Sequence, residues 1–113
     1  MFPLQNRLKK KNDFERVFKQ GNSARGSLLF LKILNNSKNV SRIGFVVSKK
    51  ISNKAVVRNK VKRRLRAAAK EELKNYLPGY DMVIVTLPAI KNADYKEIKK
   101  DVSLVFKKGY NLK

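Results

Sequence analysis

The sequence contains no cysteine and no histidine, and these absences narrow the chemistry open to the chain. Without cysteine it has no disulfide, no thiolate zinc site and no cysteine nucleophile, and nothing suggests secretion. Without histidine it lacks the usual general base at neutral pH, the commonest metal ligand and any Ser-His-Asp triad. The sequence therefore disfavours a hydrolase that works by itself.

Long hydrophobic runs are missing too. No stretch approaches the roughly 20 apolar residues that span a bilayer, and the segment MFPLQNRLKKK lacks the apolar core of a signal peptide. We therefore expect a soluble, cytoplasmic protein with no membrane partner. Because 42% of its 113 residues are hydrophobic, we expect one domain over residues 1–113.

Acidic residues are scarce: 8 Asp and Glu stand against 28 Lys and Arg, so the net charge is +20 at pH 7. This excess predicts a polyanionic partner. The acidic residues either belong to expected helices or stand isolated, the first group being Asp13, Glu15, Glu71, Glu72, Asp94 and Glu97 and the second Asp81 and Asp101. A nuclease centre built from clustered carboxylates on the protein is therefore disfavoured.

The basic residues are concentrated. Between Glu15 and Glu71 there are 16 Lys and Arg and no acidic residue, and residues 49–70 hold ten of them. Apolar residues recur at helical spacing through this segment, namely Val57, Val61, Leu65, Ala68, Leu73 and Tyr76. The pattern predicts a charged helix that packs on a core, not a solvated tail.

Three helices and three strands are expected. Helices are predicted over residues 13–20, with a capping box of Asn12 and Glu15; over 54–77, capped by Ser52 or Asn53; and from an Asp94–Glu97 capping box up to Gly109. Strands are predicted over residues 27–34, 41–48 and 80–87, the first two forming a hairpin through polar residues 35–39. The order α-β-β-α-β-α predicts an α+β two-layer sandwich in which the last strand adds a parallel neighbour.

The long basic helix should present one charged side. Asn59, Arg63, Arg66 and Lys70 lie within about 60° of one another on an ideal helix, and we call these four residues the basic rail. Their cations repel one another unless phosphates neutralise them, so the rail predicts contact with folded or duplex RNA.

A second surface follows from strand alternation. Arg42, Gly44, Val46 and Ser48 should share one face of their strand, as should Leu28, Phe30, Lys32 and Leu34. Phe14 and Phe18 are one helical turn apart and fit either a core or a stacking platform. Beside Lys49 and Lys50 such rings would bind single-stranded nucleic acid.

Residues 52–66, SNKAVVRNKVKRRLR, closely resemble the signature helix of the bacterial ribonuclease P protein subunit. The resemblance extends through Asn6-Arg7-Leu8, residues 14–18, Val47-Ser48-Lys49-Lys50 and residues 95–107. It implies an accessory subunit of an endoribonuclease in tRNA processing. A catalytic RNA with bound Mg²⁺ would remove the 5′ leader of precursor tRNA, while the protein binds both RNAs, holds no metal or catalytic residue and needs no protein partner.

The resemblance also assigns residues. The RNA-binding positions of the signature helix would be Arg58, Asn59, Lys60, Lys62, Arg63 and Arg66, and the leader cleft would contain Phe14, Phe18, Lys32, Val46, Ser48, Lys49 and Lys50. It further implies one additional short strand and a left-handed strand-helix-strand crossover. There are three departures from the family pattern: Lys60 replaces an Arg, Lys32 replaces an aromatic residue of some relatives, and Thr86-Leu87 stands where relatives often have a basic residue.

Two other classes share parts of this pattern. A small ribosomal or RNA-chaperone protein would have the same composition, and only the signature helix with its paired Phe residues separates it from the first reading. Peripheral binding to anionic membranes needs a large lipid-facing stripe, whereas the stripe here is rich in Ala and is expected to face the core.

Overall fold

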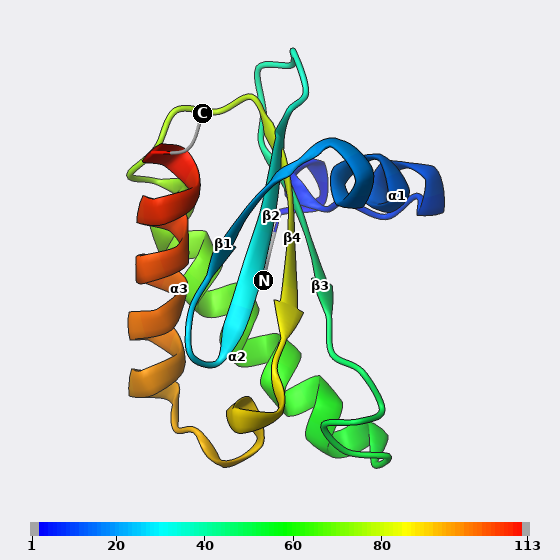
Figure 1. Ribbon diagram of the computed structural model, residues 1–113, viewed down its shortest axis with the longest axis vertical. Coiled ribbons are helices and arrows are strands. Elements are labelled where there is room, and N and C mark those ends of the chain that lie inside the picture. Colours follow the sequence, from blue (N-terminus) through cyan, green and yellow to red (C-terminus); the bar gives the residue numbers. More distant parts are fainter. Residues whose placement is uncertain (1–2, 112–113) are drawn as a thin grey trace.

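The computed structural model describes residues 3–111, so residues 1–2 and 112–113 of the predicted domain lie outside the described part (Figure 1). Its elements are a short 3-10 helix η1 (Leu4–Asn6), α1 (Lys11–Gln20), β1 (Asn22–Arg25), β2 (Leu29–Asn35), β3 (Arg42–Val46), α2 (Ala55–Leu73), β4 (Tyr80–Thr86), a second 3-10 helix η2 (Pro88–Asn92) and α3 (Tyr95–Asn111). The predicted α+β class is confirmed, and β1 is the additional short strand that the family resemblance implies.

The strands form one sheet in the order β1-β2-β4-β3. The predicted hairpin of residues 27–34 with residues 41–48, which correspond to β2 and β3, is wrong. β4 lies between these two strands, antiparallel to β2 and parallel to β3. β4 is apolar on both faces, with Met82 and Ile84 in one hydrophobic cluster and Val83 in the other. A strand that is buried on both sides belongs in the centre of a sheet, and this requirement outweighs the short connection between β2 and β3.

The helices cover the two faces of the sheet unequally. Apolar side chains of α2 and α3, among them Leu65, Val102 and Phe106, join Leu31 and Ile84 of the sheet in the main core. The shorter α1 packs on β2 and β4 from the other side, where Val17 and Val83 belong to a smaller cluster. In Figure 1 β3 and β4 run in the same direction while α2 crosses behind them, which gives the left-handed crossover that the family resemblance implies.

Helix boundaries differ from the expectations where caps decide them. α1 begins at Lys11 after Lys10, and its start has no side-chain cap, so the Asn12–Glu15 capping box is absent. α2 likewise starts without a side-chain cap and ends at Leu73, short of residue 77. The second capping box is confirmed, because the amide of Asp94 donates to Glu97 Oε1 (3.1 Å) and the amide of Glu97 donates to Asp94 Oδ1 (2.9 Å).

The third helix does not stop at Gly109 as expected. It continues to Asn111, and a Cβ on Gly109 would lie 2.9 Å from Leu31 Cδ2. The glycine therefore allows close approach of α3 to β2 rather than ending the helix.

Candidate RNA interface

The basic rail of α2 points away from the core. Asn59, Arg63, Arg66 and Lys70 are all exposed, as is Lys60, while Lys62 is half-buried. The other side of the helix buries Val61, Leu65, Ala68 and Ala69. The predicted division of this helix into a charged side and a packed side is confirmed, so the rail is available to a macromolecular polyanion.

Two arginines of α2 also hold neighbouring loops. Arg58 Nη1 donates to the carbonyl oxygen of Ser52 at 2.9 Å, and Arg64 Nη1 donates to that of Ala93 at 3.4 Å. Both side chains are half-buried. Arg58, assigned to RNA by the family resemblance, thus also fixes the segment that leads from β3 into α2.

The face of the sheet that carries α1, which we call the α1 face, is only partly covered. The strand register places Phe30 beside Val85 and Val85 beside Val46, and it places Lys32 beside Val83 and Val83 beside Gly44. Phe30, Lys32, Val46 and Val85 are all half-buried. Lys32 and Val46 thus share a face, as alternation predicts. Leu28 does not: it packs against the main core.

Phe14 and Phe18 differ in environment. Phe14 is half-buried and packs against the cluster of Leu8, Val17 and Val83. Its ring lies over Gly44, where a Cβ would come within 2.3 Å of Phe14 Cζ. Phe18 is 39% exposed. Phe18 is therefore the better placed of the two to stack on a ligand, and Phe14 supports the helix on the sheet.

The expectation that Asp81 is isolated is wrong. It is fully buried, and Arg42 contacts both of its oxygens, Nε to Oδ1 at 2.9 Å and Nη2 to Oδ2 at 2.7 Å. Arg16 of α1 donates to Oδ2 at 2.8 Å, and Asn36 donates to Oδ1 at 2.8 Å. Burial alone would raise the pKa of Asp81, but these hydrogen bonds and the charge of Arg42 outweigh it and lower the pKa.

This carboxylate network ties α1 to the sheet. Arg42 also approaches Asp13 of α1 (3.4 Å), and its own pKa is raised, chiefly by the hydrogen bond to Asp81. Arg42 and Asp81 are paired positions of β3 and β4. Because this pairing depends on the strand register, the sequence alone does not show that the two residues meet.

A cavity of about 180 Å³ connects the rail with the α1 face. Lys62 and Arg66 of α2 border it together with Phe14 and Gly44, and Arg7 and Lys9 enter from the segment before α1. Arg7 and Lys9 are not among the residues that the family resemblance assigns to RNA. The signal for this segment in the sequence was the match of Asn6-Arg7-Leu8 to the family. The four cations make this junction strongly electropositive.

The remaining predicted cleft residues follow β3. Ser48, Lys49 and Lys50 are exposed in the turn between β3 and α2, which the Ile51 amide closes by donating to the Ser48 carbonyl at 3.1 Å. Within residues 3–111, no three acidic side chains gather as a possible metal site. No helix in the described part of the chain is long and apolar enough to cross a bilayer.

Fold and site together define a small RNA-binding protein of the α+β class, with a basic helix on one side of a four-stranded sheet and a partly uncovered face on the other. The family model described as Ribonuclease P matches residues 2–110. The chain therefore belongs to the ribonuclease P protein family, the accessory protein subunits of an endoribonuclease that processes tRNA.

Individual relatives agree along nearly their whole lengths. The ribonuclease P protein component of Pseudanabaena sp. is 39% identical over 110 residues, which is 96% of this chain and 95% of the relative. That of Bacillus velezensis is 42% identical over 104 residues, covering 91% and 88%. These likenesses disfavour the alternative of a ribosomal or RNA-chaperone protein.

Solved structures show the same fold. A Staphylococcus aureus RNase P protein mutant with defective mRNA degradation activity superposes with a TM-score of 0.86 at 31% identity, covering 94% of this chain and 89% of that one. The RNase P protein from Thermotoga maritima gives 0.79 at 26% identity, covering 88% and 96%.

Proposed function

We propose that this protein binds the catalytic RNA of ribonuclease P through the basic rail and the 5′ leader of precursor tRNA through the α1 face. The observation that carries the proposal is the arrangement of two different surfaces on opposite sides of one sheet. The rail offers exposed Arg63 and Arg66, which suit a phosphate backbone. The α1 face offers exposed Phe18 on α1 and half-buried Lys32 on β2, the strand on which α1 packs, and this combination suits a single strand.

Each residue type has a physical role in this proposal. Phe18 stacks on a leader base, while Lys32, Lys49 and Lys50 neutralise leader phosphates. Arg42 and Asp81 act only by holding α1, and with it Phe18, on the sheet. The cavity bordered by Arg7, Lys9, Lys62 and Arg66 provides a positively charged surface between the basic rail and the α1 face.

The chemistry belongs to the RNA in this proposal. The chain has no histidine or cysteine. In this proposal the Mg²⁺ ions of the reaction are bound mainly by the RNA subunit, and the complex works in the cytoplasm. Cations of the protein would offset the self-repulsion of the two RNAs, so that less Mg²⁺ is needed to bring them together.

A reconstitution experiment tests the proposal. Leader removal from a precursor tRNA is followed with bacterial catalytic RNA alone, with the protein alone and with both, over a range of Mg²⁺ concentrations. We expect the protein alone to cleave at the level of a buffer blank and the mixture to reach half-maximal rate at lower Mg²⁺ than the RNA alone. Metal-dependent cleavage by the protein, abolished by replacing a single carboxylate, would overturn the assignment, as would an unchanged Mg²⁺ requirement.

A further inference from the structure

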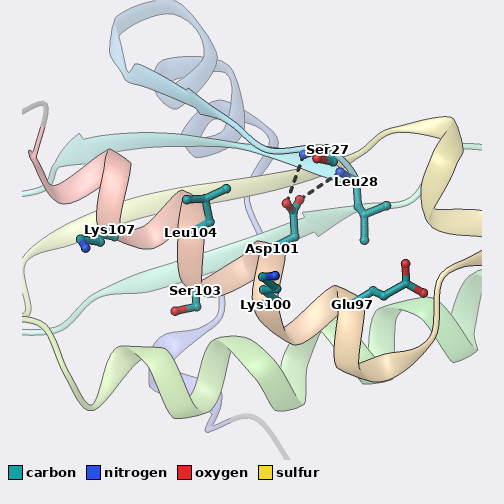
Figure 2. Close-up of a pocket in the computed structure, with 8 residues that line it drawn as sticks. All are labelled: Ser27, Leu28, Glu97, Lys100, Asp101, Ser103, Leu104 and Lys107. Atoms are coloured by element: carbon teal, nitrogen blue, oxygen red, sulfur yellow. Dashed lines mark hydrogen bonds between the residues drawn. The ribbon is translucent and has the colours of Figure 1, made fainter.

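A lysine-rimmed groove runs between α3 and the turn that joins β1 to β2 (Figure 2). Its volume is about 530 Å³, and Leu28 and the partly exposed Leu104 give it an apolar floor. Lys100 and Lys107 stand on its α3 side. We call this feature the α3 groove; the cleft and rail described above do not include it.

A buried carboxylate fixes the shape of the α3 groove. Asp101 is 7% exposed, and its two oxygens accept the amide hydrogens of Ser27 (3.1 Å) and Leu28 (3.0 Å), as Figure 2 shows. At Gly26 a Cβ would lie 2.3 Å from Asp101 Oδ2, so the turn packs directly on the carboxylate. The Asp101 carboxylate therefore joins α3 directly to the turn, the two segments that border the groove.

The exposed side of α3 repeats the spacing of the basic rail. Lys96, Lys100, Ser103 and Lys107 are exposed and stand at i, i+4, i+7 and i+11, the same intervals as Asn59, Arg63, Arg66 and Lys70. Lys100 and Lys107 are two helical turns apart, about 10 Å along the axis. Within residues 3–111 Lys99 pairs with Glu71 at 3.1 Å, whereas Lys100 and Lys107 have no ion pair.

The chemistry of the groove fits a sugar-phosphate backbone. Lysines are point charges that bind phosphate without the bidentate geometry by which arginine reads bases. The Ser27 hydroxyl can hydrogen-bond to phosphate or ribose oxygens, whereas the Ser103 hydroxyl hydrogen-bonds to Glu72 of α2. Two acidic side chains line the groove in the described part of the chain, and both accept backbone amides: Glu97 accepts that of Asp94 in the helix cap, and Asp101 accepts those of Ser27 and Leu28.

The position of the groove favours the catalytic RNA over the tRNA leader as its ligand. α3 lies in the same layer as α2, on the side of the sheet away from α1, so the α3 groove is remote from the surface proposed for the leader. It borders the β1 edge of the sheet, whereas the cavity beside Lys62 and Arg66 borders β3 at the other edge.

From these observations, and resting on the proposed function, we infer that the α3 groove is a second surface for the phosphate backbone of a duplex segment of the catalytic RNA. The protein would then hold two segments of that RNA at opposite edges of its sheet.

The test compares two variants of equal charge. Lys100→Gln with Lys107→Gln removes two cations from the groove, and Lys38→Gln with Lys91→Gln removes two exposed cations from the β2–β3 turn and η2. Affinity for the catalytic RNA alone is measured over a range of salt concentrations. We expect the groove variant to lower the log-log salt slope by about 1.8, at 0.9 for each lost duplex phosphate contact, while the control keeps nearly the slope of the parent protein.

Equal slopes for the groove variant and the control would overturn the inference. So would a loss of affinity by the groove variant for precursor tRNA alone with unchanged affinity for the catalytic RNA, because the groove would then serve the other RNA. Arg63→Ala with Arg66→Ala is measured in parallel. If this rail variant lowers the slope and the groove variant does not, the inference fails and the proposed function stands; if the rail variant also leaves it unchanged, the proposed function fails.

Discussion

The guanidinium of Arg42 and the carboxylate of Asp81 form a two-point ion pair between paired positions of β3 and β4, with donor-acceptor distances of 2.9 and 2.7 Å. Arg16 reaches the same carboxylate from α1 at 2.8 Å. One buried anion thus joins two strands and a helix, and the orientation of the helix that carries Phe18 depends on it.

Replacing Asp81 by Asn should therefore destabilise the protein by about 3 kcal/mol, because largely buried Arg42 loses its two short ion-pair contacts and keeps the longer one to Asp13 at 3.4 Å. Chemical denaturation measures the free energy of unfolding. The matched control is Glu71→Gln, which breaks the exposed pair with Lys99 (3.1 Å) and should change this free energy far less. Equal effects of the two variants on the free energy of unfolding would show that the buried Arg42–Asp81 pair stabilises the protein no more than the exposed Lys99–Glu71 pair.

The same carboxylate should make stability depend on acid. The folded state lowers the pKa of Asp81 below its ordinary value of 3.8, so the folded state favours the ionised form. Its stabilising contribution is then complete above about pH 5 and is lost as the pH falls through 3.8 to the lower folded-state pKa. Denaturation midpoints of the parent protein and Asp81→Asn should converge over this acidic range; a constant difference would contradict the assignment.

Gly44→Ala should displace the Phe14 ring, because the new Cβ would lie 2.3 Å from Cζ. We expect a loss of about 1–3 kcal/mol of stability from overpacking. Adding Phe14→Ala should recover part of that loss, since the two side chains compete for one space. Simple additivity of the two single effects in thermal or chemical denaturation would mean that the contact does not limit substitution at this position.

Phe18→Ala should weaken binding of a precursor tRNA with a leader of several nucleotides by roughly 1–3 kcal/mol, the contribution of one stacked base. Mature tRNA, which has no leader, should bind almost as before. Because Phe18 is 39% exposed, its removal should lower the melting temperature only slightly. Equal losses on both RNAs with a large fall in melting temperature would assign Phe18 to the core instead.

Arg63→Ala with Arg66→Ala should weaken binding to the catalytic RNA and lower the salt slope by about 0.9 for each lost phosphate contact. Both side chains are exposed, so folding should be unaffected. A suitable control is Arg64→Ala, because Arg64 is half-buried and its guanidinium donates to Ala93 rather than lying on the rail. An unchanged slope in the double variant would show that the rail faces solvent in the complex.

Local signals predicted much of the fold. The periodic apolar residues of α2 and the Asp94–Glu97 capping box needed no knowledge of distant contacts, and both are confirmed. The sequence predicts that α1 starts at Asp13, because Asn12 and Glu15 have the spacing of a capping box. The helix instead begins at Lys11. β1 was missed by pattern alone, since four residues with one buried side chain are too few to show alternation.

The pairing of strands that are distant in the sequence was the main wrong prediction, and part of the candidate site depends on that pairing. The sequence predicts a hairpin of residues 27–34 with residues 41–48, and this pairing does not bring Asp81 next to Arg42. In the fold β4 lies beside β3, and the two residues are paired. For the same reason the sequence showed Phe30 on a strand face but not that Val85 and Val46 extend this face across the sheet. The exposed rail of α2 was predictable because a helix face depends only on local spacing.

The central position of β4 has a consequence for biosynthesis. β2 and β3 both hydrogen-bond to β4, and residue 86 is the last residue of that strand. Until this residue has left the ribosome the nascent chain cannot complete its sheet, although most of its basic residues are already exposed. A chain of this charge is then an incompletely folded polycation beside ribosomal RNA, and its sheet becomes complete only when the last strand pairs with both of its neighbours.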